Sequence, residues 1–121
     1  MVKRTVSLLL AMILTVTLCA CGKTSGGSWQ EQYDLGVRYL SDGNYEEAII
    51  AFTAAIKIDS KRAEAYLGLS DAYTEQGDIA NAIEVLERGQ EQTGDQTIQE
   101  RLEQLLALQN STTLNSYGVY S

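Results

Sequence analysis

The side chains with the most distinctive chemistry are two thiols, Cys19 and Cys21, and the 121-residue sequence has no other cysteine. A thiol is the strongest nucleophile among the common side chains. The chain has no histidine, so it lacks the commonest general acid or base and the commonest metal ligand. A glycine-rich phosphate loop is also missing. We therefore expect no enzymatic activity, no cofactor and no metal site.

The charged residues are mostly acidic, with 16 Asp and Glu against 9 Lys and Arg and a formal net charge of -7. A chain of this charge is a poor match for a phosphate backbone, so no nucleic-acid partner is expected. Neighbouring acids such as Glu46 and Glu47 are typical of a solvated helix face rather than of a catalytic carboxylate pair.

The two thiols follow an uncharged stretch that starts after Lys3 and Arg4 and runs from Thr5 to Leu18. A basic start followed by an apolar stretch of this length is typical of a secretory signal. The stretch is shorter than the roughly 20 apolar residues of a spanning helix. An uncleaved single-span anchor remains the alternative.

The end of this stretch, Leu18-Cys19-Ala20-Cys21, resembles the lipobox of bacterial lipoproteins. The resemblance implies that a diacylglyceryl group is attached to Cys21 and that a signal peptidase cuts before it, removing Cys19. One acyl chain holds a protein only marginally, at about 0.8 kcal/mol per methylene, whereas two chains anchor it stably. We expect a membrane-anchored, extracytoplasmic lipoprotein.

The resemblance also divides the N-terminal region. Residues 1–20 are expected to be the signal peptide, and 21–28 the lipidated N-terminus with a flexible linker rich in glycine and serine. Such a linker spans on the order of 15 Å. Because the remaining chain is acidic and would be repelled by anionic lipid, the lipid itself must hold it at the membrane.

The rest of the chain repeats itself after 34 residues. Large, small and turn residues recur in the same order, a period typical of stacked helix–turn–helix units. Small residues let two helices approach closely, and large ones fill the space between them at helical spacing. The matched pairs are Leu35 with Leu69, Tyr39 with Tyr73, Gly43 with Gly77, Ala48 with Ala82, and Ile49 with Ile83.

This pattern resembles the tetratricopeptide repeat, whose leucine-glycine pair corresponds to Leu35 and Gly36. The resemblance implies an all-α fold, a short α-solenoid with two helix–turn–helix units at about 29–62 and 63–96. A capping helix follows at 97–109, so that the repeat domain covers 29–109. Residues 110–121 are either a polar tail or the start of a missing domain.

Local signals support these helices. Gly43 and Gly77 are expected to end the first helices with left-handed backbone. Asn44 and Asp78 then serve as N-caps, with capping-box spacing from Asn44 to Glu47. Asp95 can cap the last helix.

Two positions depart from the family pattern. The proline that commonly ends each unit is absent. Gly89 replaces the usual alanine, which predicts a helix weaker by about 1 kcal/mol and a looser second unit.

In this family the inner face of the first helix of each unit lines a groove for peptides. The repeat register assigns particular residues of this chain to that face. Its apolar members would form one exposed patch, which often marks a contact site, and its acids favour an apolar ligand with basic groups. The alternative is that the linker or a missing domain covers the patch. The predicted partner-binding residues are Tyr33, Val37, Leu40, Leu67, Asp71 and Thr74, and the register adds Gln30, Ser41, Glu64 and Glu75, with Arg101 and Leu105 from the capping helix.

These features together imply a protein–protein interaction scaffold or adaptor in the cell envelope, which binds an unknown protein or peptide partner in the groove. Tethering would raise the effective concentration at the membrane. The alternative is the N-terminal adaptor region of a longer surface enzyme or transport component. A solute-binding lipoprotein is the weakest interpretation, because two repeats enclose little volume.

Overall fold

The computed structural model describes residues 27–116 of the chain. The predicted signal peptide, Cys21 and most of the predicted linker lie outside the described residues, as do residues 117–121. All regular structure in the described part is helical, which confirms the predicted all-α class. The helices are α2 (Trp29–Ser41), α3 (Tyr45–Ile58), α4 (Ala63–Glu75), α5 (Ile79–Thr93) and α6 (Gln96–Ser116).

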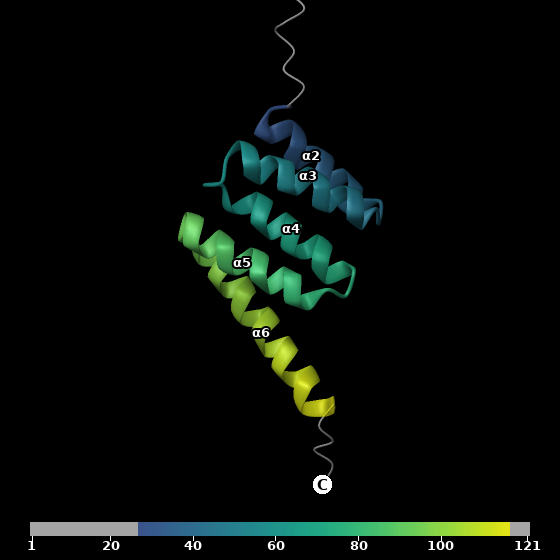
Figure 1. Ribbon diagram of the computed structural model, residues 1–121, viewed down its shortest axis with the longest axis vertical. Helices are drawn as coiled ribbons and strands as arrows, with labels where there is room; N and C mark the ends of the chain where they lie inside the picture. Colours follow the sequence, from purple (N-terminus) through teal and green to yellow (C-terminus); the bar gives the residue numbers. More distant parts are fainter. Residues whose placement is uncertain (1–26, 117–121) are drawn as a thin grey trace, which may run out of the picture.

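Consecutive helices stack into a short solenoid (Figure 1). Helices α2 and α3 form the first hairpin, and α4 and α5 form the second. Helix α4 packs on α3 and α6 packs on α5, while α4 also contacts both α2 and α6. Helices α2, α4 and α6 therefore share one layer, and α3 and α5 form the other.

Both hairpin turns depend on a glycine with left-handed backbone. Gly43 has a φ of 78° and Gly77 a φ of 82°. This conformation is strained for residues with a Cβ and is open to glycine. The prediction for both turn glycines is confirmed.

The two hairpins start their second helices differently. The Asp78 side chain accepts a hydrogen bond from the Asn81 amide at 3.2 Å, as expected of an N-cap. Asn44 occupies the equivalent place in the first hairpin but makes no side-chain cap bond. The capping box expected from Asn44 and Glu47 is therefore wrong.

A capping box does occur at the start of α2. The Ser28 hydroxyl accepts from the Glu31 amide at 3.2 Å, and the Glu31 carboxylate accepts from the Ser28 amide at 2.9 Å. Ser28, predicted as the end of the linker, thus fixes the first turn of the helical array.

The core is organised around Phe52 of α3, which is fully buried. A Cβ on Gly36 of α2 would lie 2.7 Å from the Phe52 ring, and one on Gly68 of α4 would lie 2.5 Å from it. These glycines let one aromatic ring fill the space between three helices. The main buried cluster comprises Ala48, Phe52, Tyr66, Leu69, Ala72, Ala82, Ile83, Val85, Leu86, Ile98, Leu102 and Leu105.

Gly89 has a packing role in the second unit that helix propensity does not reveal. A Cβ there would lie 2.8 Å from Cγ of Tyr66 and 3.1 Å from Cδ1 of Ile98. The Tyr66 ring is buried in the space that this glycine leaves, and its hydroxyl donates to the Ser60 carbonyl at 2.9 Å. Gly89 therefore allows close packing, which corrects its interpretation as a loosening residue.

Helix α6 begins at Gln96, directly after Asp95, whose carboxylate accepts from the Thr97 amide at 2.8 Å, so the predicted cap is confirmed. Its apolar residues Ile98, Leu102 and Leu105 are buried. The helix continues beyond the predicted end at 109 to Ser116, and its last part projects from the stack (Figure 1). The first residues of the predicted tail are thus helical.

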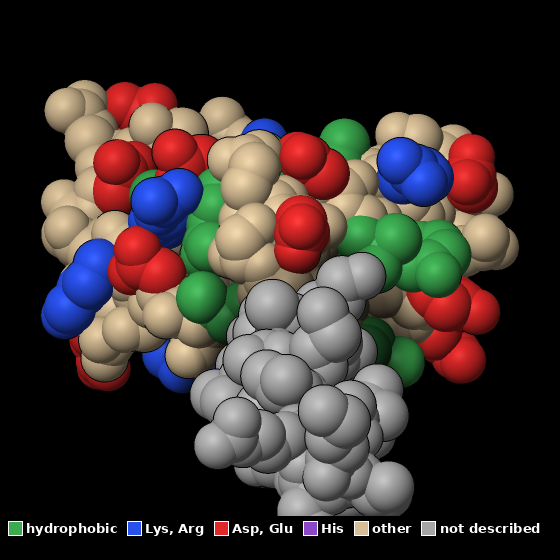
Figure 2. Space-filling model, turned by 90° about the horizontal axis from the view of Figure 1, so that it is seen from above, with side chains coloured by type: hydrophobic (Ala, Val, Ile, Leu, Met, Phe, Trp, Pro, Cys, Tyr) green, Lys and Arg blue, Asp and Glu red, His purple; other side chains and the backbone are tan. Residues whose placement is uncertain are grey.

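The outer face of α2 is polar, whereas α6 has polar residues at two equivalent positions and three exposed leucines, Leu106, Leu108 and Leu114. Three charged residues of α2 stand where the next unit has small residues that pack on the preceding helix. These pairs are Glu31 with Ala65, Asp34 with Gly68, and Arg38 with Ala72. In α6, Glu103 and Gln104 stand where α4 has the buried Leu69 and Ser70. From above, charged side chains separate small apolar groups on the described surface (Figure 2).

Candidate binding groove

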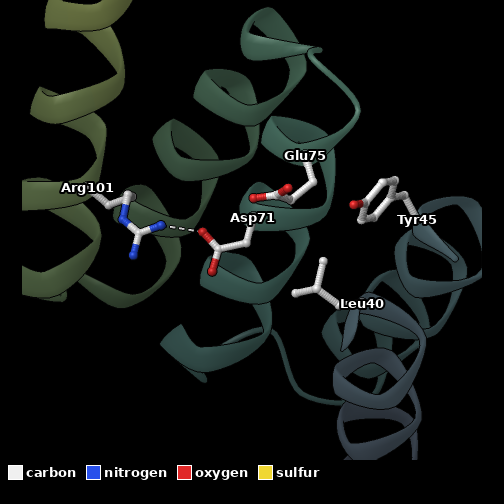
Figure 3. Close-up of a pocket in the computed structure, with 5 residues that line it drawn as sticks. All are labelled: Leu40, Tyr45, Asp71, Glu75 and Arg101. Atoms are coloured by element: carbon white, nitrogen blue, oxygen red, sulfur yellow. Dashed lines mark hydrogen bonds and ion pairs between the residues drawn. The ribbon is translucent and has the colours of Figure 1, made fainter. Parts of the chain in front are cut away.

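A cavity of about 420 Å³ opens in the layer formed by α2, α4 and α6. Figure 3 shows its side chains, which converge from these three helices and from the start of α3. We call this space the groove cavity. It is lined by Leu40, Tyr45, Asp71, Glu75 and Arg101.

The local fold explains why these residues meet. Asp71 and Glu75 are four residues apart on α4, so both point from the same face of that helix. Leu40 lies near the end of α2, and the tight turn at Gly43 returns the chain so that Tyr45 lies beside it. Arg101 reaches the cavity from α6, 30 residues further along the chain than Asp71.

Arg101 and Asp71 form an ion pair and a hydrogen bond across the cavity wall, from Nη1 to Oδ1 (Figure 3). Burial raises the pKa of the Asp71 carboxyl above its ordinary value of 3.8, and the Arg101 guanidinium opposes this rise. The Glu75 carboxylate adds to the rise. The side chains of the pair are 40% and 37% exposed, so the pair contributes at most about 1 kcal/mol to stability. Its larger effect is on the charge of the cavity.

Glu75 carries a second carboxylate into the cavity. That carboxylate makes no hydrogen bond or ion pair with any residue in the described range. The cavity thus holds two acidic groups and one guanidinium, and its local charge is negative.

A family model described as tetratricopeptide repeat matches residues 39–108, more than half of the chain. The chain belongs to the tetratricopeptide repeat family. The match spans both hairpins from the end of α2 and includes the first part of α6. No curated protein matches the chain. Membership makes this chain a repeat scaffold of a kind that binds proteins or peptides.

Two of the six predicted groove residues of this tetratricopeptide array, Leu40 and Asp71, line the groove cavity. Val37 is 41% exposed one turn before Leu40 on α2. Thr74 is half-buried, and its hydroxyl donates to the Ser70 carbonyl at 2.8 Å.

The other two predicted residues, Tyr33 and Leu67, are half-buried and pack against the core. The Tyr33 ring stacks on Trp29, with centroids 4.9 Å apart. Burial raises the pKa of the Tyr33 hydroxyl, and Glu64, Asp34 and Asp71 raise it further. Carboxylates of both α2 and α4 therefore lie near the Tyr33 hydroxyl.

The capping helix contributes only one of its two expected groove residues. Arg101 lines the cavity, whereas Leu105 is 5% exposed and belongs to the core. Tyr45 was not among the predicted groove residues. The signal for it was its place directly after a three-residue turn, which returns the chain to the rim of the groove.

Among the residues that the structure describes, no helix has both the length and the apolar character needed to span a membrane.

Proposed function

We propose that this protein is a scaffold or adaptor of the cell envelope, anchored outside the cytoplasm by lipid on Cys21, that holds a protein partner in its tetratricopeptide groove. The observation that carries this proposal is the groove cavity, where side chains of α2, α3, α4 and α6 converge. No single helix forms this site, so it is a product of the stacked array.

Exposed apolar residues on two of the helices that form the cavity support a binding surface. Val37 presents an apolar side chain that is 41% exposed. Leu108, one repeat period after Thr74, is 48% exposed on α6. Apolar positions next to charged ones are typical of protein contact sites.

The N-terminal sequence supports the tether. A basic start, an apolar stretch and a lipobox-like end precede a short glycine- and serine-rich segment. Because α2 begins at Trp29, the lipid on Cys21 would hold the array within on the order of 15 Å of the membrane. A tethered groove meets membrane partners at a raised effective concentration.

The groove part of the proposal is tested by crosslinking and affinity capture from native membranes with the full chain. Val37→Glu places a charge in the groove at an exposed position, so it should lose the captured partner while helix content is unchanged. Ile50→Glu is the matched control, because Ile50 is 69% exposed and lies on α3 outside the groove cavity. Equal capture by the native chain and both variants would overturn groove binding.

The tether is tested by Cys21→Ala. Without the thiol no thioether can form, so the protein should leave the membrane fraction or accumulate as an uncleaved precursor. Normal cleavage together with membrane retention would refute the lipid anchor. A Cys19→Ala variant is the control and should be processed normally.

A further inference from the structure

The groove cavity has an uneven distribution of charge. Asp71 is already paired with Arg101, whereas Glu75 has no ionic partner in the described part of the chain. Burial raises the pKa of the Tyr33 hydroxyl, and the nearby carboxylates of Glu64, Asp34 and Asp71 add to this rise. Of the two carboxylates that line the cavity, that of Glu75 is thus the one free to pair with an incoming group.

The opposite wall of the cavity combines apolar surface with one hydroxyl, that of Tyr45, which points towards α4 (Figure 3). Leu40 of α2 and the Tyr45 ring of α3 lie across from the two acids of α4 (Figure 3). A volume of about 420 Å³ admits a whole side chain. Long basic side chains combine an apolar stem, which packs on such a wall, with a charged end.

An acidic side chain fits the same cavity poorly. Arg101 is the cation that would attract it, but Asp71 already neutralises that guanidinium. The Glu75 carboxylate would repel a second anion. The arrangement therefore selects against acidic groups as well as for basic ones.

We propose that the groove cavity receives a lysine or arginine side chain from a linear segment of the partner protein. The Glu75 carboxylate pairs with the cation, and Leu40 and Tyr45 pack on the aliphatic stem. Asp71 and Arg101 form the end wall and hold α6 in place beside α4. This inference rests on the proposed function, since it specifies the chemistry of the partner for the same groove.

The test uses the full chain in detergent and four pools of capped synthetic nonapeptides. One central position is fixed as lysine, arginine, norleucine or glutamate, and the other positions are random. Norleucine matches the lysine stem without the charge. The lysine and arginine pools should bind roughly fivefold more tightly than the norleucine pool, and the glutamate pool should bind most weakly.

Three variants make the test specific. Glu75→Gln should remove the preference for basic pools, and Glu75→Lys should reverse it in favour of glutamate. Glu87→Gln is the matched control, because Glu87 is an exposed acid on α5 outside the cavity, and it should keep the native preference.

The outcomes separate this inference from the proposed function. If the pools bind equally and Val37→Glu abolishes their binding, the groove is a peptide site without a basic preference, and the inference is overturned alone. If no pool binds while Val37 remains essential for partner capture from membranes, the linear basic ligand is likewise refuted. A preference that persists in Glu75→Lys would also overturn it. Failure of both the pools and the membrane capture would remove the proposed function itself.

Discussion

At the scale of single residues, helix propensity and packing predict opposite effects for a substitution at Gly89. Propensity alone predicts that Gly89→Ala stabilises the protein by about 1 kcal/mol. The structure predicts the opposite sign, because the new Cβ would lie 2.8 Å from Cγ and 2.9 Å from Cβ of Tyr66, and the backbone fixes the position of that Cβ. We expect a loss of about 1–3 kcal/mol in the free energy of unfolding, measured with urea.

A second substitution checks the cause of that loss. Tyr66→Ala should by itself reduce stability, since it removes a buried ring and its bond to Ser60. In its presence Gly89→Ala should cost less than in the native chain, because Cγ is gone and the space left by the ring lets the two helices adjust. Additive effects of the two changes would contradict the packing explanation.

Asp71 gives a prediction that depends on pH. Burial holds the folded-state pKa of its carboxyl above 3.8 despite the Arg101 guanidinium. A raised folded-state pKa contributes stability that is fully present below the unfolded pKa and is lost as the pH rises through the folded pKa. The native chain should therefore lose stability relative to Asp71→Asn as the pH rises from below 3.8 towards neutrality.

The direct measurement for Asp71 is an NMR titration of its carboxyl carbon. Arg101→Gln removes the opposing cation, so it should move the pKa of Asp71 further upward. A pKa below 3.8 in the native chain, or a downward shift in Arg101→Gln, would contradict this account of the cavity.

At the scale of helices, the two equivalent N-caps should differ in their energetic contribution. Asp78 accepts the Asn81 amide, whereas the Asn44 side chain makes no such bond. Asp78→Ala should cost about 1 kcal/mol of unfolding free energy, and Asn44→Ala should cost less. Urea unfolding with unchanged m-values measures both, and an equal loss from the two substitutions would be evidence against the difference in capping.

The helices and turns were predictable because the residues that form them recur with the repeat period. Gly43 and Gly77 mark turns by residue type alone, and Asp95 marks a helix start. The end of α6 was not predictable in the same way, because no glycine or proline follows 109 to stop the helix before Ser116. Which N-cap forms its bond depends on the detailed turn geometry, which the sequence does not show.

At the scale of the whole molecule, the groove cavity depends on contacts between residues far apart in the chain. The register predicted a face with Leu40 and Asp71, but the pairing of Asp71 with Arg101 depends on how α6 packs beside α4. Tyr45 enters the cavity only because the turn at Gly43 returns the chain beside Leu40. Sequence periodicity gives the face of each helix, and the stacking of the helices gives the site.

The polar outer face of α2 bears on where a partner can bind. Glu31, Asp34 and Arg38 cover this end of the array. It offers little apolar surface for stacking another helix, whereas α6 at the other end has three exposed leucines, Leu106, Leu108 and Leu114. The groove has an exposed apolar side chain, Val37, and an unpaired acid, Glu75. We therefore expect partner binding along the groove and not at the end formed by α2.

The most direct test of groove binding places a photo-reactive amino acid at single positions of the full chain in its native membrane. Replacement at Val37 should yield a covalent adduct with the partner, because this side chain lies beside the groove cavity. The same residue at Glu84, exposed on α5, should yield none, and Glu75→Lys should diminish the Val37 adduct. An adduct from Glu84 with none from Val37 would contradict the account.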